Sequence, residues 1–319
     1  MTALSKITVE DIKAARDRLQ PYLATTPLEA APAAGEQIWL KLENANRTHS
    51  FKVRGALNAM LLLSQEARAR GVVTASSGNH AQALSYAAGL LGIRARIVMP
   101  VYTARRKVEN AARLGGETLL FGSNYEAAEA EALRLAREEG LVYLSAYNHP
   151  DVIAGAGTIG LEIVAALPDV QRVIVPVGGG GLISGIALAV KAFDPAIEVV
   201  GVNASTSADM FNHYYGERRP TDHRTLADAL EGAIETGSIT FELTRAYVDR
   251  IVLVSEDAIA RAMRFMVYQQ GWVAEGGGSV GLAALLDGVL PADRQTAIVI
   301  SGGNVDAAVL RAVLSAGDR

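Results

Sequence analysis

The stretch 176–190, PVGGGGLISGIALAV, joins an apolar strand-like run to a helix-like run through four successive glycines. Such glycines let several backbone N–H groups converge, and the start of a helix adds a partial positive charge, so the turn suits a phosphate. A plain turn would need only one or two glycines. Gly179, Gly181 and Gly185 also approximate a dinucleotide fingerprint, but the next predicted strand ends in Asn203, where an acid that binds ribose would be expected.

The runs around this turn repeat one pattern along most of the chain. A short run rich in Val and Ile is followed by a polar or glycine-rich turn and then by a helical stretch, which is typical of βαβ units. The predicted strands cover 38–43, 72–76, 95–100, 117–122, 142–146, 172–177, 198–203, 250–255 and 296–301. Thr8 and Asp11 form a capping-box pattern that predicts an opening helix reaching Pro21. The fold class is therefore α/β, with parallel sheets flanked by helices.

The predicted strands fall into two groups, which the stretch 148–157, NHPDVIAGAG, separates. We therefore predict a large domain made of residues 1–62 and 150–319, and a small inserted domain over residues 63–149. Ligands of open parallel sheets bind beyond the carboxyl ends of the strands, so we expect the site in the cleft between the domains.

Composition restricts the classes of partner. The chain has 319 residues, half of them hydrophobic, and a formal net charge of -4, so no basic field draws in nucleic acid or an anionic membrane. It has no cysteine, which removes disulfides, thiolate metal sites and cysteine nucleophiles. No apolar run has the length of a signal peptide or a membrane span. These features predict a cytoplasmic enzyme that acts on small molecules.

Three further stretches carry chemically useful side chains. In SFKVRG, residues 50–55, apolar neighbours would desolvate Lys52 and lower its pKa, which makes the free amine a nucleophile. In VVTASSGNHAQALSYAA, residues 72–88, a polar turn before a helix offers donors to a substrate carboxylate, from Ser76, Ser77, Asn79 and His80. TAIVISGGN, residues 296–304, brings Ser301 to a strand end. An amine, a phosphate site, a carboxylate site and a hydroxyl are the parts that pyridoxal phosphate and an amino acid require.

Taken in order, ENANRTHSFKVRGA, SSGNHAQALSYAA, VIAGAGT, VPVGGGGLISGIA and ISGGN cover nearly the whole chain. This set resembles the fold type II pyridoxal-phosphate enzymes, the tryptophan synthase β-like group that includes threonine and serine dehydratases and serine racemase. The resemblance implies a homodimer with pyridoxal phosphate in the interdomain cleft and Lys52 as its covalent anchor. It also implies that Phe51 packs near the ring, that Asn79 lies by the ring hydroxyl, and that Ser301 meets the pyridine nitrogen. The phosphate would be held by Gly178, Gly179, Gly180, Gly181 and Leu182.

The residue at the pyridine nitrogen predicts the type of reaction. A serine hydroxyl leaves the ring largely neutral, so the carbanion is weakly stabilised and loss of a β-hydroxyl is favoured. We therefore predict an ammonia-lyase that converts a β-hydroxy amino acid such as L-threonine or L-serine to a 2-keto acid and ammonia, with Lys52 as the base. The alternatives are a racemase with Ser77 as the second acid-base group, a less favoured β-replacement synthase, and a catalytically inactive ligand-binding protein.

Several positions depart from the family pattern, and they gather on the substrate side. They are Asn46, His49, Ala156 and Gly276. His49 has two open interpretations, a side chain that faces the cleft or a structural histidine. Where family members carry a glutamate that binds a divalent cation, this chain has Asn203, followed by Ser207 and Asp209, so no metal is predicted.

Overall fold

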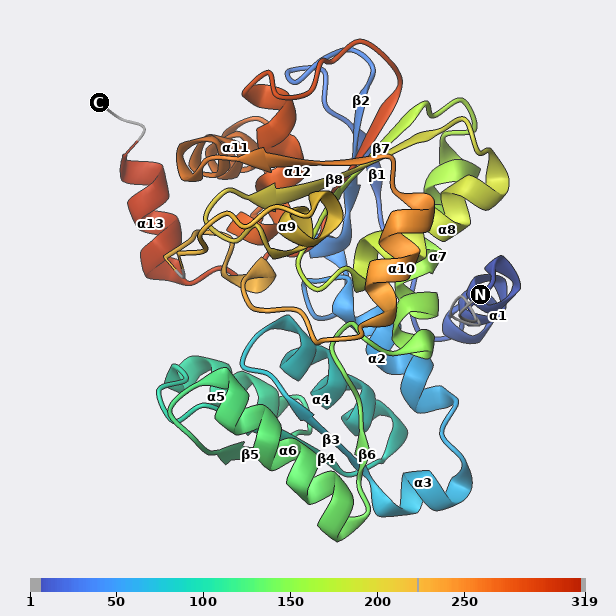
Figure 1. The fold of residues 1–319 in the computed structure, drawn as a ribbon, viewed down its shortest axis with the longest axis vertical. Coiled ribbons are helices and arrows are strands. Elements are labelled where there is room, and N and C mark those ends of the chain that lie inside the picture. The colour runs from blue at the N-terminus through green and yellow to red at the C-terminus, as the bar shows by residue number, and fades with distance from the viewer. Residues whose placement is uncertain (1–6, 223, 317–319) are drawn as a thin grey trace.

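The computed structural model describes residues 7–222 and 224–316. In this part of the chain ten strands form two separate sheets, which lie one above the other in Figure 1. The larger sheet has six strands in the order β1-β2-β10-β7-β8-β9, and all neighbours are parallel except β1 and β2. Its strands are β1 (Leu28–Ala30), β2 (Ile38–Leu42), β7 (Arg172–Pro176), β8 (Glu198–Ala204), β9 (Arg250–Val254) and β10 (Thr296–Ile300).

The smaller sheet is wholly parallel and has the order β5-β4-β3-β6. Its strands are β3 (Val72–Ala75), β4 (Ala95–Met99), β5 (Glu117–Leu120) and β6 (Val142–Tyr143). All nine predicted strands are present, although β6 is much shorter than predicted and β1 was not predicted. The strands of the smaller sheet lie within 63–149, and the division into domains at these bounds stays a prediction.

Helices cover both sheets. The first, α1, has the predicted capping box, in which Thr8 and Asp11 bond each other's backbone N–H. The helices are α1 (Val9–Leu19), α2 (Lys52–Leu61), α3 (Gln65–Arg70), α4 (Asn79–Leu91), α5 (Arg105–Arg113), α6 (Tyr125–Glu139), α7 (Pro150–Ala166), α8 (Gly181–Phe193), α9 (Asp209–Tyr215), α10 (Ile239–Tyr247), α11 (Glu256–Tyr268), α12 (Gly276–Leu286) and α13 (Ala307–Ser315), with short 3₁₀ turns η1 (Glu43–Ala45) and η2 (Asp228–Leu230). No described helix combines the length and the hydropathy that crossing a membrane requires.

Strand β10 shows how the larger sheet is buried on both faces. Ile298 and Ile300 pack into the apolar cluster that contains residues of α11 and α12, whereas Ala297 and Val299 pack into the cluster that contains residues of α7 and α8. Burial of both faces explains why the strand reads as a continuous apolar run rather than an alternating one. The predicted α/β class is confirmed.

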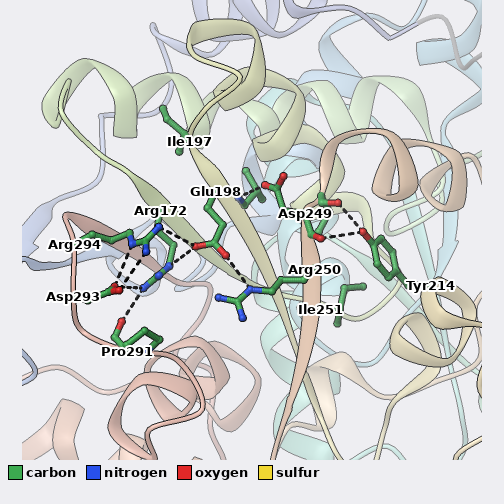
Figure 2. A network of polar contacts seen from close by, with 12 residues as sticks. Arg172, Ile197, Glu198, Tyr214, Asp249, Arg250, Ile251, Pro291, Asp293 and Arg294 are labelled. Carbon is green, nitrogen blue, oxygen red and sulfur yellow. Dashed lines mark hydrogen bonds and ion pairs between the residues drawn. The ribbon is translucent and has the colours of Figure 1, made fainter.

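The amino ends of three parallel strands are held by charges, as Figure 2 shows. Glu198, the first residue of β8, accepts hydrogen bonds from Arg172 on β7 at 2.7 Å and from Arg250 on β9 at 2.9 Å. Arg172 is only 1% exposed and also donates to the Pro291 carbonyl at 2.7 Å. This network holds the amino ends of these strands in place. The polar motifs lie at the other edge of the sheet, at the carboxyl ends of the strands.

Candidate active site

Main-chain contacts join the SFKVRG motif, residues 50–55, to the end of the TAIVISGGN motif, residues 296–304. Ser50 forms an antiparallel bridge with Gly302, and the Phe51 N–H donates to the Ser301 carbonyl at 3.0 Å. Lys52 then opens α2, one residue after this pairing. Residues some 250 positions apart in the chain are thereby brought together at the carboxyl end of β10.

Lys52 is partly exposed, but its amine is surrounded by other groups of the protein. Its Nζ donates to the Ala146 carbonyl at 2.8 Å and lies 5.0 Å from the centre of the Phe51 ring. Loss of water lowers the pKa of Lys52 to about 8, while the nearby Glu275 carboxylate acts in the opposite direction. The shift has the direction that the sequence predicted, and it leaves roughly a tenth of the amine neutral at pH 7.

A buried ion network holds α2 beneath this lysine. Arg54 donates from Nε and Nη2 to the Glu43 carboxylate, each at 2.8 Å, and from Nη1 to Glu162 at 2.6 Å. Lys41, also buried, donates to Glu162 at 2.6 Å. Two cations and two carboxylates are thus paired, which avoids an unpaired buried charge next to the site.

The glycine loop lies between β7 and α8 and is closely packed. A Cβ atom on Gly179 would lie 2.5 Å from Cγ of Tyr147, and one on Gly180 would lie 2.6 Å from Cε of Met210. Gly180 also has φ = 87°, in the region that favours glycine, and caps α8. Packing and backbone conformation therefore require glycine at these two positions, directly before the first N–H groups of α8, which have no partners inside the helix.

The polar turn 76–80 precedes α4 and is more open. Ser76, Ser77 and Gly78 are all half-buried, and nothing lies within 4 Å of a Cβ placed on Gly78. Ser76 Oγ accepts the Gly78 N–H at 3.3 Å. Within the described chain no hydrogen bond engages the Ser77 hydroxyl. The N–H groups of the first turn of α4 have no partners inside the helix, so the turn offers donors to an anion.

Asn79 joins this turn to the carboxyl end of β10. Its Nδ2 donates to Glu275 Oε1 at 2.6 Å, and its Oδ1 accepts from Asn304 Nδ2 at 2.7 Å. Ser301 lies at the same end and is 4% exposed, and no hydrogen bond within the described residues engages its hydroxyl. Asn79 is therefore held at the carboxyl end of β10, where Ser301 bonds to Phe51, the neighbour of Lys52.

Glu275 belongs to the site, although none of the sequence motifs assigned it a role. It precedes α12, and burial together with the charge of Asp228 raises its pKa to about 7, against the hydrogen bond from Asn79. The departure from the family pattern next to it, Gly276, has a steric reason, because a Cβ there would lie 2.0 Å from the Leu226 carbonyl oxygen. The sequence feature that could have identified Glu275 is an acidic residue directly before a run of glycines at the start of a helix.

The His80 ring is engaged away from the turn. Its Nε2 donates to the Leu144 carbonyl at 3.3 Å, and burial together with the nearby Lys52 charge lowers its pKa to about 3, so the ring is neutral. Its Nδ1 is buried and finds no partner among the described residues. The backbone N–H of His80 remains the group that suits the predicted carboxylate contact.

Two departures from the family pattern have structural explanations. His49 has φ = 53°, the left-handed conformation, which explains why a glycine suits this position, and its side chain is exposed. Asn203 donates to the Val177 carbonyl at 2.6 Å and accepts from the Phe211 N–H at 3.1 Å, so its amide is used to hold the start of the glycine loop. Within the described residues no three His, Asp or Glu side chains gather closely enough to hold a metal ion.

These features fit pyridoxal phosphate. The donor set contains a partly neutral lysine amine, helix N–H groups behind a glycine loop for the phosphate, and a serine hydroxyl without a partner in the described chain. The family described as pyridoxal-phosphate dependent enzyme matches residues 19–302. The chain belongs to this pyridoxal-phosphate-dependent family. Its fold and its cofactor, as predicted from the sequence, are confirmed.

Curated relatives and solved structures similar to this pyridoxal-phosphate-dependent enzyme agree with the family assignment. An L-threonine ammonia-lyase of Thermotoga maritima is 44% identical over 317 residues, which cover 98% of this chain and 79% of the relative. A maize serine racemase structure superposes with a TM-score of 0.89 at 33% identity, covering 98% of both chains. A threonine deaminase from Solanum lycopersicum gives 0.88 at 34% identity, covering 96% of this chain and 86% of that one. The predicted enzyme class, a lyase of the dehydratase type, is confirmed; the roles of individual site residues stay predictions.

Proposed function

We propose that this enzyme is an ammonia-lyase that dehydrates a β-hydroxy amino acid, such as L-threonine or L-serine, to a 2-keto acid and ammonia. The observation that carries the proposal is the partly neutral Lys52 amine, which lies 2.8 Å from the Ala146 carbonyl and follows Phe51, whose N–H donates to the Ser301 carbonyl. Similarity to the L-threonine ammonia-lyase and the threonine deaminase supports the substrate class. The proposal includes a cytoplasmic location and a homodimer, which rest on composition and family resemblance.

Each part of the site has a task in this reaction. Bound pyridoxal phosphate would supply an electron sink for the bonds at the substrate Cα. Lys52 would hold the cofactor and, when free, take the proton from Cα. The first turn of α4, with Ser76, Ser77 and the backbone N–H groups of Asn79 and His80, would bind the carboxylate. Ser301 would donate its hydroxyl to the neutral ring nitrogen, which favours loss of the β-hydroxyl over free carbanion chemistry.

Racemisation is the second candidate, and one observation favours it specifically. The Ser77 hydroxyl is half-buried, has no hydrogen bond within the described chain, and lies in a turn separate from the element that carries Lys52. A second acid-base group of this kind is what inversion at Cα requires. The similarity to maize serine racemase supports this candidate.

A panel of hydroxy amino acids tests both candidates in one experiment. We expect ammonia and keto acid from serine- or threonine-like substrates, and little reaction with alanine, which has no β-hydroxyl. Inversion of the substrate without ammonia would favour the racemase. Protein that binds pyridoxal phosphate and turns over no member of the panel would favour the inactive ligand-binding alternative.

A further inference from the structure

The segment Ser145–Asn148, between β6 and α7, touches both predicted anchors of the cofactor. The Ala146 carbonyl accepts the hydrogen bond from Lys52 Nζ at 2.8 Å. The Tyr147 ring packs against the glycine loop so closely that a Cβ on Gly179 would lie 2.5 Å from its Cγ. A shift of this short segment would therefore move the partner of the amine and the packing of the phosphate loop together.

The same segment is held from its other side by Glu235, in the connection between η2 and α10. Glu235 Oε2 accepts from Asn148 Nδ2 at 2.6 Å, and Oε1 accepts from Ser145 Oγ at 3.2 Å. The Glu235 N–H donates to the Tyr147 hydroxyl at 2.9 Å. Three of the four residues of the segment are thus bonded to one glutamate, and the fourth, Ala146, is the partner of Lys52.

Two further observations strengthen this arrangement. The Ile239 N–H, at the start of α10, donates to Asn148 Oδ1 at 3.1 Å, so the amide of Asn148 is bonded at both ends. Burial and the nearby carboxylates of Glu235 and Glu129 raise the pKa of Tyr147. Its phenol therefore stays neutral beside a loop suited to an anion, where a phenolate would repel a phosphate.

We propose that Glu235 is a positioning residue for cofactor binding, which holds Ser145–Asn148 so that the Ala146 carbonyl faces Lys52 and the Tyr147 ring supports the glycine loop. This inference rests on the proposed function, because it assumes that Lys52 and the glycine loop hold pyridoxal phosphate. Glu235 belongs to none of the motifs of the sequence, and its role follows only from the contacts that it makes.

The test measures cofactor binding by the apoenzyme rather than turnover. Pyridoxal phosphate is titrated into wild type, Glu235→Ala, Glu235→Gln and Asn148→Ala, and its binding rate is followed by visible absorbance from pH 6 to pH 10. Glu242→Gln, an exposed acid on neighbouring α10, is the matched control. We expect Glu235→Ala to weaken binding about tenfold, close to the effect of losing one hydrogen bond to a charged group, and the Gln and Asn148 variants to lie between it and wild type.

The pH profile separates positioning from mere stabilisation. The hydrogen bond to Ala146 favours the protonated amine, so its loss should move the midpoint of the binding rate about half a pH unit lower. Glu275, whose charge acts on this amine, and the neutral His80, whose pKa the Lys52 charge lowers, are unchanged in these variants. Loss of thermal stability alone would leave the midpoint where it is.

Failure of this inference differs from failure of the proposed function. Wild-type protein that binds no pyridoxal phosphate would overturn both. Wild-type binding together with Glu235 and Asn148 variants that match Glu242→Gln in affinity and midpoint would overturn only the role of Glu235. Asn148→Ala, which retains the charge of Glu235, keeps the test decisive if Glu235→Ala does not fold.

Discussion

Two strand-to-helix turns, one from each sheet, form opposite parts of the proposed site. The glycine loop leads from β7 into α8, and the polar turn 76–80 leads from β3 into α4, and each helix has 13 residues. In the loop, a Cβ on Gly179 or Gly180 would come within 2.6 Å of a neighbouring side chain. In the polar turn, a Cβ on Gly78 would meet nothing within 4 Å. The chain's own packing therefore requires glycine in the first turn, whereas the second turn leaves room for a ligand.

The largest effect is expected in the polar turn. If Ser77 is the acid-base group opposite Lys52, Ser77→Ala should abolish racemisation and slow turnover about 10²- to 10⁴-fold, because a positioned proton donor typically contributes that much. Steady-state rates and enantiomer analysis measure the effect. Asn79→Ala is the comparison variant and should chiefly alter the absorbance of bound cofactor. A loss of turnover below tenfold in Ser77→Ala would show that Ser77 is only a hydroxyl at the start of a helix and not an acid-base group.

The next effect concerns Glu275, which joins the polar turn to β10 through Asn79. Its pKa rises from 4.5 to about 7 on folding, so between these values the folded apoenzyme binds more protons than the unfolded chain. Stability should then fall as pH rises through this window, by about 3 kcal/mol in all. Denaturant unfolding of the apoenzyme at pH 4.5 to 8 measures this slope.

Glu275→Gln supplies the matched control for that slope, because its amide does not titrate. The variant should lose the fall in stability between pH 4.5 and 7. Lys52, whose pKa is lowered, acts with the opposite sign and stabilises the folded apoenzyme as pH rises above about 8. Identical slopes in wild type and Glu275→Gln would mean that Glu275 is not protonated on folding.

The direct test of the comparison between the two turns is a pair of alanine substitutions. Gly179→Ala pushes against the Tyr147 ring and should destabilise the protein by about 1–3 kcal/mol, as overpacking does, while weakening cofactor binding. Gly78→Ala should destabilise the protein less, since nothing lies within 4 Å of the added Cβ and φ at this residue, -113°, is not left-handed. Equal destabilisation by both substitutions would contradict the difference in packing between the glycine loop and the polar turn.

The smallest effect is expected at His49, next to neither turn. Its left-handed backbone, φ = 53°, suits glycine, so His49→Gly should stabilise the protein by about 0.5–1 kcal/mol and leave turnover unchanged. His49→Ala keeps the strain and removes the imidazole, so it separates backbone from side chain. Turnover that falls in both variants would favour the alternative interpretation, a side chain that acts in the cleft.

The sequence predicted the parts of the molecule whose physical cause is local. Runs of Val and Ile predict buried parallel strands, and four adjacent glycines predict a tight turn before a helix, because both signals lie within a few residues; the phosphate contacts of this turn stay a prediction. Strand β1 was missed because Leu28–Ala30 is short and exists only through pairing with β2. Propensity carries no information about such a partner.

The missed groups in the site have a common reason. Glu275 gains its raised pKa from burial and from Asp228, and Glu235 gains its contacts from residues about 90 positions earlier in the chain. Both effects arise only when separate segments meet, so a glutamate in a loop gives no sign of them in the sequence. The polar turn, by contrast, was recognised because its serines, glycine and asparagine are adjacent.

The most direct test of the central claim, that Lys52 holds the cofactor at the meeting point of these two turns, is chemical. The holoenzyme is reduced with borohydride, digested and mapped by mass spectrometry. The account predicts one pyridoxyl group, on Lys52, in the peptide that contains SFK, and none on the buried Lys41. A pyridoxyl group on any other lysine, or protein that carries none after reduction in the presence of pyridoxal phosphate, would contradict it.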